Sequence, residues 1–267
     1  MKMRRIFLKL GGSLITDKHR PSTAKPEIIE RLADEILYAI RSDDKVQLII
    51  GHGSGSFGHI PAKQYQTRQG VHTPEEWQGF LEVYRQARKL NQIVYDIFSQ
   101  KGLPVIAFPP SAMILANNKH LSKWNPKPLV AALQAGFIPL VNGDVVFDTK
   151  IGGTIFSTED VFATLAATLP PTEILLCGIE NGVFADFPVC SQLLPKITAT
   201  EKARILPLLQ GSAAPDVTGG MVEKVRLMFE LIETYPLLRA MIFSGLYPGN
   251  LQNALSGIPA GTLLTKE

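Results

Sequence analysis

Short runs of β-branched and other apolar residues recur along the chain, each bounded by glycine, proline or polar residues. The six runs are Ile6–Leu10, Val46–Ile50, Val105–Phe108, Ile138–Val141, Ile174–Cys177 and Ala240–Phe243. Continuous apolar runs of this length are typical of strands that are buried on both faces of a parallel sheet. The pattern therefore predicts six central strands.

Between these runs, apolar residues return every three or four positions, which is the spacing of one helix face. One such segment carries Ile28, Ile29, Leu32, Ile36, Leu37 and Ile40, and the next carries Trp77, Phe80, Leu81, Tyr84, Ala87, Ile93, Val94 and Ile97. Because strands and helices alternate, the sequence predicts an α/β fold with a mostly parallel central sheet.

One interruption of this alternation predicts an inserted β-hairpin. Val145–Phe147 and Thr154–Ser157 flank a turn that contains Asp148-Thr149-Lys150 and Gly152-Gly153. Two short apolar runs around such a turn are typical of a hairpin, and the residues after it predict a helix over Glu159–Thr168.

Composition narrows the class of protein. The chain has 267 residues, of which 45% are hydrophobic, so a single domain over 1–267 is expected. Its 27 basic and 24 acidic residues leave a net charge of only +3, which argues against nucleic acid as a partner.

Membrane attachment and secretion are not expected either. Lys9 and then Gly11-Gly12 interrupt the first apolar run, so it predicts a strand rather than a signal segment. The sequence contains no apolar stretch long enough to span a membrane. Two cysteines, Cys177 and Cys190, are too few for a disulfide framework, which favours a cytoplasmic location.

Three glycine-rich loops are the strongest chemical signal. They are Lys9-Leu10-Gly11-Gly12-Ser13, Gly51–His59, and Asp216-Val217-Thr218-Gly219-Gly220-Met221. Glycine lets backbone N–H groups approach an anion closely, and in open α/β sheets such loops gather beyond the carboxyl ends of the strands. Neither the Walker pattern nor the dinucleotide fingerprint is present. The loops therefore predict a site for several phosphate groups in a less common nucleotide-binding fold.

At these motifs the sequence resembles the isopentenyl phosphate kinases of the amino-acid-kinase superfamily, over nearly the whole chain. The matching elements are Lys9–Ser13, Asp17-Lys18, His52–His59 with Lys63 and Tyr65, Pro110-Ser111, Gly143-Asp144 with Asp148, Ser157–Asp160, and Asp216–Met221 with Lys224. The resemblance implies a three-layer αβα sandwich and, usually, a homodimer. It also implies that the acceptor binds over the N-terminal half, about 1–165, and ATP over the C-terminal half, about 166–267.

The implied reaction is transfer of the terminal phosphoryl group of ATP to isopentenyl phosphate. Phosphoryl transfer needs two anions held in line while fixed cations offset their repulsion. Lys9 is the candidate for the lysine that touches the transferring phosphoryl group, and Lys224 is the candidate on the nucleotide side. Lys18 matches a third lysine of the family near the phosphates. His59 is expected at the phosphate of the acceptor, where a nearby anion would favour a protonated ring.

The remaining candidates bind the two substrates. For ATP they are Gly11, Gly12, Ser13, Gly182, Asp216, Gly219 and Gly220; for the acceptor they are Gly53, Ser54, Gly55, Gly58, Gly143 and Asp144, with Phe80 and Tyr84 as a wall for the prenyl tail. Mg²⁺ is expected as the counterion of ATP, without a protein ligand. The stretch Pro188–Pro215 lacks a regular pattern and is predicted to form a flap over the nucleotide.

Two segments depart from the family pattern. Ser157-Thr158-Glu159-Asp160 stands where Ser-Gly-Asp-Asp is expected, so either Glu159 or Asp160 is the carboxylate that orients the lysines. Gly178-Ile179-Glu180-Asn181 lacks acids that usually flank the nucleotide. The alternatives are therefore a kinase of the same fold that acts on a phosphonate, a nucleoside monophosphate or a carboxylate, and a nucleotide-binding regulator without turnover.

Overall fold

The computed structural model describes residues 3–43, 45–209 and 220–267. The strands are β1 (Arg4–Leu10), β2 (Val46–His52), β3 (Val105–Ala107), β4 (Ile114–Asn117), β5 (His120–Trp124), β6 (Ile138–Asn142), β7 (Asp144–Asp148), β8 (Gly152–Phe156), β9 (Glu173–Gly178), β10 (Val183–Phe184), β11 (Leu193–Leu194), β12 (Lys196–Thr198), β13 (Arg239–Ser244) and β14 (Gly261–Thr265). The longer helices are α2 (Pro26–Ser42), α3 (Gly55–Gln64), α4 (Pro74–Gln100), α6 (Lys127–Gln134), α7 (Thr158–Thr168) and α9 (Gly220–Thr234). Short helical turns are α1 (Gly12–Ile15), η1 (Thr67–Gln69), α5 (Pro110–Met113), η2 (Ala199–Glu201), α8 (Lys202–Ile205), η3 (Leu206–Leu209) and α10 (Asn250–Leu255).

One sheet runs through both halves of the chain in the order β12-β14-β13-β9-β1-β2-β6-β3. All six predicted central strands lie in it, and their neighbours pair in parallel. The sequence did not predict β14, which pairs antiparallel with β13, or the edge strand β12 beside it. The predicted α/β class with a mostly parallel sheet is confirmed.

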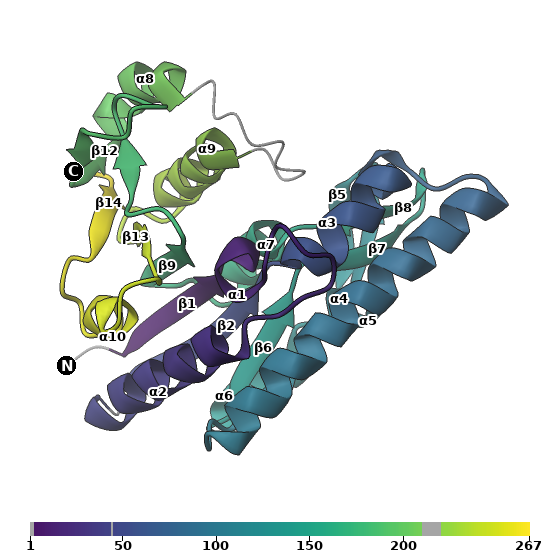
Figure 1. Ribbon diagram of the computed structural model, residues 1–267, viewed down its shortest axis with the longest axis horizontal. Coiled ribbons are helices and arrows are strands. Elements are labelled where there is room, and N and C mark those ends of the chain that lie inside the picture. Colours follow the sequence, from purple (N-terminus) through teal and green to yellow (C-terminus); the bar gives the residue numbers. More distant parts are fainter. Residues whose placement is uncertain (1–2, 44, 210–219) are drawn as a thin grey trace.

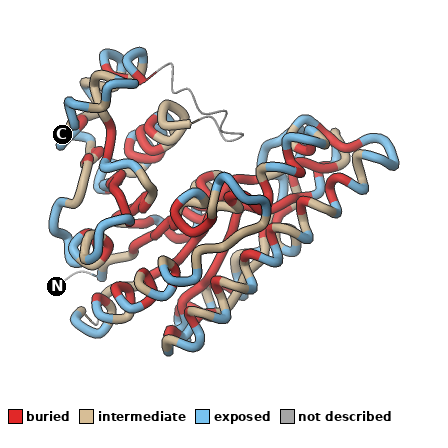
Figure 2. The backbone as a smooth tube through the Cα atoms, viewed as in Figure 1, coloured by how far each residue is buried: buried red, intermediate tan, exposed pale blue. Residues whose placement is uncertain are grey.

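Helices cover both faces of this sheet and give three layers (Figure 1). Along β1, Phe7 faces a core that includes α6, α7 and α9, whereas Ile6 and Leu8 face a second core that includes α2, α4 and α10. Figure 2 shows the buried residues concentrated on the strands between these helices. Because successive residues of a strand point to opposite faces, one apolar run supplies both cores.

The predicted hairpin is present as β7 and β8, which pair antiparallel. It belongs to a separate four-stranded sheet in the order β5-β4-β7-β8, two of whose strands the sequence analysis did not predict. The Asp148 carboxylate joins the two turns of this sheet, since it accepts hydrogen bonds from Asn118 N, Lys119 N, Lys150 N and Ile151 N at 2.7–3.1 Å. This small sheet lies beside α3 and the start of α4 (Figure 1).

The stretch Pro188–Pro215 is more regular than expected over its described part. Residues 188–209 contain β11, β12, η2, α8 and η3, of which β12 joins the central sheet. Residues 210–215 lie outside the described ranges, so the predicted flap stays a prediction. Among the described helices, none combines the length and apolar character needed to cross a membrane.

Candidate active site

A cavity of about 560 Å³ lies at the carboxyl ends of the central strands. Sixteen residues predicted for the site line it: Lys9, Gly11, Gly12, Ser13, Lys18, Gly53, Ser54, Gly55, Gly58, His59, Gly143, Asp144, Glu159, Gly182, Gly220 and Lys224. The fold brings them together because β1, β2 and β9 run parallel, so the loops that follow them meet at one edge.

The first two glycine loops pack backbone against backbone. Gly53 N donates to Leu10 O at 3.0 Å, and a Cβ added at Gly12 would lie only 2.4 Å from Gly55 N. The buried Thr16 hydroxyl joins the two loops, since it donates to Gly12 O at 2.7 Å and accepts from Ser56 N at 3.0 Å. Glycine is required at this contact because any side chain would separate the two loops.

Two lysines and one glutamate form the charged centre of the cavity. The Lys9 ammonium at the end of β1 donates a hydrogen bond to Glu159 Oε1. Both residues are buried, at 8% and 5% exposure. Burial disfavours the Glu159 carboxylate, but the charge and hydrogen bond of Lys9 and the charge of Lys224 outweigh it and lower the pKa of Glu159. Glu159 is therefore ionised beside two cations.

The first turn of α7 decides which acid faces the lysines. Ser157 and Asp160 form a capping box, in which Asp160 Oδ2 accepts from Ser157 N at 2.8 Å and Ser157 Oγ accepts from Asp160 N at 3.1 Å. Asp160 also pairs with Arg68 at 3.6 Å. Of the two acids predicted as alternatives, Glu159 contacts Lys9, and Asp160 does not line the cavity.

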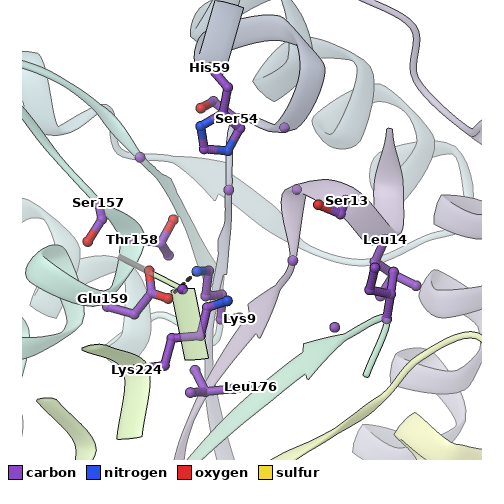
Figure 3. A pocket seen from close by; sticks show the side chains of 18 of the residues that line it. Lys9, Ser13, Leu14, Ser54, His59, Ser157, Thr158, Glu159, Leu176 and Lys224 are labelled. Atoms are coloured by element: carbon purple, nitrogen blue, oxygen red, sulfur yellow. Dashed lines mark hydrogen bonds and ion pairs between the residues drawn. The ribbon is translucent and has the colours of Figure 1, made fainter. Parts of the chain in front are cut away.

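His59 lies across the cavity from the charged centre. Figure 3 shows its ring extending from α3 beside Ser54, while the side chains of Lys9, Lys224 and Glu159 gather on the other side. Lys18 lines the cavity from the loop between α1 and α2. The site therefore offers cations at one end, a histidine at the other, and glycine backbone between them.

Asp144 carries a buried carboxyl at the start of strand β7. Its Oδ2 accepts from Ser111 N at 3.2 Å and its Oδ1 from Val145 N at 2.9 Å. Burial raises the pKa of Asp144 to about 6, although these hydrogen bonds and the charge of Arg88 oppose the shift. Asp144 is therefore a carboxyl whose protonation changes close to neutral pH.

His52 differs from His59, although both belong to the second glycine loop. His52 is fully buried, and this burial lowers the pKa of its ring to about 4 despite an opposing hydrogen bond to Gly53 O. Its Nε2 lies 3.0 Å from Asn91 Nδ2 on α4. Because an amide nitrogen is a donor, Nε2 accepts and Nδ1 carries the proton. His52 is a neutral link between the loop and α4.

The apolar lining of the cavity from the N-terminal half of the chain differs from the prediction. Phe80 packs on the rings of Trp77 and Phe147 in a separate core, and Tyr84 packs against that core. Neither lines the cavity; Val83 and Ala87 of the same helix line it, as do Ile60, Ala62 and Ile155. Helix α4 does line the cavity, but its large aromatic residues pack toward the small sheet.

Several cavity residues from the C-terminal half of the chain were only partly predicted from the sequence. Gly178, Ile179 and Glu180 line the cavity, so the segment that departs from the family pattern does lie at the site. Phe184, Phe187, Cys190 and Leu209 also line it, without a sequence signal that would have indicated them. Asp216 and Gly219, predicted to bind ATP, lie outside the described residues.

Comparison with known proteins defines the class. Residues 4–244 match the amino acid kinase family. The chain is 31% identical over 263 residues to an isopentenyl phosphate kinase of Methanocaldococcus jannaschii, covering 96% of each protein. It is 32% identical to that of Methanothermobacter thermautotrophicus, over 94% of this chain and 95% of the relative. An X-ray structure of an isopentenyl phosphate kinase superposes with a TM-score of 0.82 at 29% identity, over 98% of this chain and 100% of that one.

The match to the family covers most of the chain and includes the lysine at the end of β1, both described glycine loops and the first turn of α9. The chain belongs to the amino acid kinase family and, within it, to the isopentenyl phosphate kinases.

Proposed function

We propose that this protein transfers the γ-phosphoryl group of ATP to the phosphate of isopentenyl phosphate and forms isopentenyl diphosphate and ADP. A phosphate oxygen of the acceptor forms the new bond to the γ-phosphorus, and the bond from that phosphorus to the β–γ bridging oxygen breaks. The observation that carries the proposal is the Lys9–Glu159–Lys224 cluster facing His59 across one cavity lined by glycine backbone.

Charge is the main obstacle to this reaction. Two unit charges 4 Å apart repel by about 4 kcal/mol at an effective dielectric of 20, and two phosphate groups multiply that cost. Lys9 and Lys224 offset the repulsion around the migrating phosphoryl group, with Glu159 holding both ammonium groups in place. Lys18 adds a third positive charge from its loop.

The two substrates are assigned to different parts of the cavity. We assign the acceptor to residues of about 1–165, with Gly53, Ser54, Gly55 and His59 at its phosphate, and the nucleotide to about 166–267. We assign Gly12 and Ser13 as backbone donors to ATP. Gly11 lines the same part of the cavity, but its N–H already donates to Cys177 O at 2.7 Å. Gly182, Gly220 and the segment Gly178–Glu180 line the nucleotide side.

The prenyl tail is assigned to the apolar part of the acceptor half. Val83 and Ala87 of α4 face Ile60, Ala62 and Ile155 of the same cavity. Each buried CH₂ contributes about 0.8 kcal/mol, so a five-carbon tail needs only a small wall of this kind. A carboxylate acceptor such as glutamate would leave this wall without an apolar partner.

Mg²⁺ supplies additional charge neutralisation when it is bound with ATP. Within residues 3–43, 45–209 and 220–267, no group of three or more His, Cys, Asp and Glu side chains is arranged to hold a metal ion. We propose, as the family resemblance implies, that the metal is held mainly by phosphate oxygens and water. A homodimer in the cytoplasm, as the family resemblance and the two cysteines suggest, remains a prediction.

The test is a panel of acceptors with ATP and Mg²⁺, with ADP release as the readout. Turnover with isopentenyl phosphate should exceed turnover with UMP, acetylglutamate or a phosphonate. Replacement of His59 by Ala should lower kcat/KM by about 10²–10³, the usual cost of one donor to a reacting anion. Faster turnover on UMP or acetylglutamate would show a different acceptor, and tight ATP binding without ADP release would show a regulator.

A further inference from the structure

Lys18 lies on a short loop, residues 17–23, that has no helix or strand of its own. A bridge between Thr16 and Ala24 closes the base of the loop, and Asp17 N donates to Thr23 O at 2.9 Å. Lys18 itself is exposed and lines the cavity. The base of the loop is therefore fixed, but the direction of Lys18 depends on contacts made further along.

Ser22 makes those contacts from a strained position. Its φ of 47° lies in the left-handed region, which residues other than glycine seldom adopt and which persists where surrounding contacts fix it. Ser22 N donates to Ser56 O at 3.2 Å, and Thr23 N lies 3.4 Å from Ser56 Oγ. Ser56 belongs to α3, one turn before His59, so this side of the loop is attached to the predicted acceptor-binding helix.

Gln86 of α4 holds the other side of the loop. Ser22 Oγ donates to Gln86 Oε1 at 2.8 Å, and Gln86 Nε2 donates to Glu82 Oε1 at 2.8 Å. Because the Glu82 carboxylate can only accept, the amide must present its oxygen to Ser22. The orientation of Gln86 is therefore set by its own helix, and the Ser22 hydroxyl receives a preorganised acceptor.

The same stretch of α4 lines the cavity. Val83 and Ala87, one turn apart, face the predicted position of the prenyl tail, and Gln86 is adjacent to Ala87. One helix thus touches both the acceptor wall and the loop that carries Lys18.

We infer that Gln86 is a positioning residue for the transfer: its hydrogen bond to Ser22 holds the 17–23 loop so that Lys18 faces the migrating phosphoryl group. The inference rests on the proposed function and on the role assigned there to Lys18. Gln86 acts on the reaction through Lys18, so its loss should lower kcat. A change in the wall formed by Val83 and Ala87 would instead change the KM for the acceptor.

The kinetic test compares Gln86→Leu and Ser22→Ala with wild type. Each should lower kcat by about five- to tenfold, the effect of losing one hydrogen bond, with little change in the KM for isopentenyl phosphate. The double variant should be no slower than either single one. In a Lys18→Ala background, Gln86→Leu should change kcat less than about twofold, because the lysine that it positions is gone.

Two further variants separate positioning from helix stability. Gln92→Leu removes an equivalent contact on the same helix, from Gln92 Nε2 to Asp96 Oδ1 at 2.7 Å, and should leave kcat unchanged. The exchange Glu82→Gln with Gln86→Glu keeps an acceptor for Ser22 and a donor at position 82, and should restore most of kcat. A loss of kcat that is as large without Lys18 as with it, or an effect on the acceptor KM alone, would overturn the inference.

A second readout does not depend on catalysis. The Lys18–His19 bond is the trypsin site on this loop, because Pro21 blocks cleavage after Arg20. Release of the loop in the intact protein should therefore speed cleavage after Lys18. Gln86→Leu and Ser22→Ala should both be cut faster than wild type and Gln92→Leu at the wild-type rate. If wild type fails to phosphorylate isopentenyl phosphate yet the loop is cut faster in the variants, the proposed acceptor is wrong and the loop contact stands. Equal cleavage rates in all four proteins would overturn the contact itself.

Discussion

Asp144 has a carboxyl that folding makes harder to ionise. Its ordinary pKa is 3.8, and burial raises the pKa in the folded protein to about 6. Between these two values the folded state binds a proton that the unfolded state has lost. The free energy of unfolding must therefore fall as pH rises from about 4 to about 6, because the ionised carboxylate is the form that burial disfavours.

Asp144→Asn removes this dependence and gives the first prediction. Between these pKa values, the free energy of unfolding of the wild type changes by about 1.4 kcal/mol per pH unit. On going from pH 6 to pH 4, the wild type should therefore become more stable relative to the variant by up to about 3 kcal/mol. Urea unfolding at several pH values measures the difference. An amide also loses one acceptor toward Ser111 N, but that cost is the same at every pH and does not change the slope.

Asp148→Asn is the matched control for that measurement. Burial disfavours its carboxylate, but four backbone N–H donors outweigh burial and lower the pKa of Asp148. Its stabilising effect should therefore be full above the ordinary pKa and be lost as pH falls through the folded value, the opposite slope to Asp144. Parallel slopes for the two variants would contradict the assigned environments.

At the scale of single residues, the sequence predicted which residues lie near the cavity better than it predicted which way their side chains point. Lys9 was identifiable because it stands in an apolar run that buries its stem, and a buried ammonium needs an acid such as Glu159. Phe80 was assigned to the cavity, but helical spacing alone does not say which apolar neighbour a face will meet. Phe80 packs against a second sheet, some of whose strands have no apolar run in the sequence. The smaller Val83 lines the cavity instead.

Helix α7 gives neighbouring acids at its first turn two separate tasks. Glu159 at the second position reaches Lys9, and Asp160 at the third position closes the capping box with Ser157. The helix geometry thus turns consecutive carboxylates in different directions. The sequence contains a signal that separates them, because Asp160 stands three residues after Ser157, the spacing of a capping box, and Glu159 does not.

Exchanging each acid should separate catalysis from stability. Glu159→Gln should lower kcat by about 10² or more, since Lys9 and Lys224 lose the charge that holds them. Asp160→Ala should lower the free energy of unfolding by about 1 kcal/mol through loss of the cap, with kcat/KM within a few-fold of wild type. Steady-state kinetics and urea unfolding on both variants check this. The reverse pattern would show that Asp160 is the acid of the site.

Among the elements, strands buried on both faces were predicted from the sequence, whereas exposed or edge strands were not. Strands such as β1 and β9 are buried on both faces and leave a continuous apolar run in the sequence. Strand β5 is exposed at its first four residues, and β12 has three residues at the edge of the sheet, so neither leaves such a run. Their pairing depends on neighbours distant in sequence, which a local pattern does not contain.

Across the whole molecule, the two ends of the central sheet have different tasks. The cavity lies at the carboxyl ends of the strands, whereas Arg4 opens β1 and Glu173 opens β9 at the amino ends. Arg4 Nε and Nη2 donate to Glu173 Oε1 and Oε2 at 2.8 and 3.1 Å, a bidentate pair. At about 3.3 Å per residue, Arg4 lies roughly 16 Å from Lys9 along the same strand.

Glu173→Gln should therefore weaken the fold and leave the chemistry unchanged. The Glu173 side chain is only 8% exposed and Arg4 25%, so loss of the pair should lower the free energy of unfolding by about 1–3 kcal/mol. Glu233→Gln is the matched control. Glu233 pairs with Lys202 at 2.9 Å, but its side chain is 53% exposed, so loss of this pair should lower the free energy of unfolding by less than about 1 kcal/mol. Thermal unfolding and steady-state kinetics are measured on both. A fall in kcat for Glu173→Gln without loss of stability would mean that the two ends of the sheet are coupled. A change at the amino ends of the strands would then have altered the lysines at the carboxyl ends without destabilising the core between them.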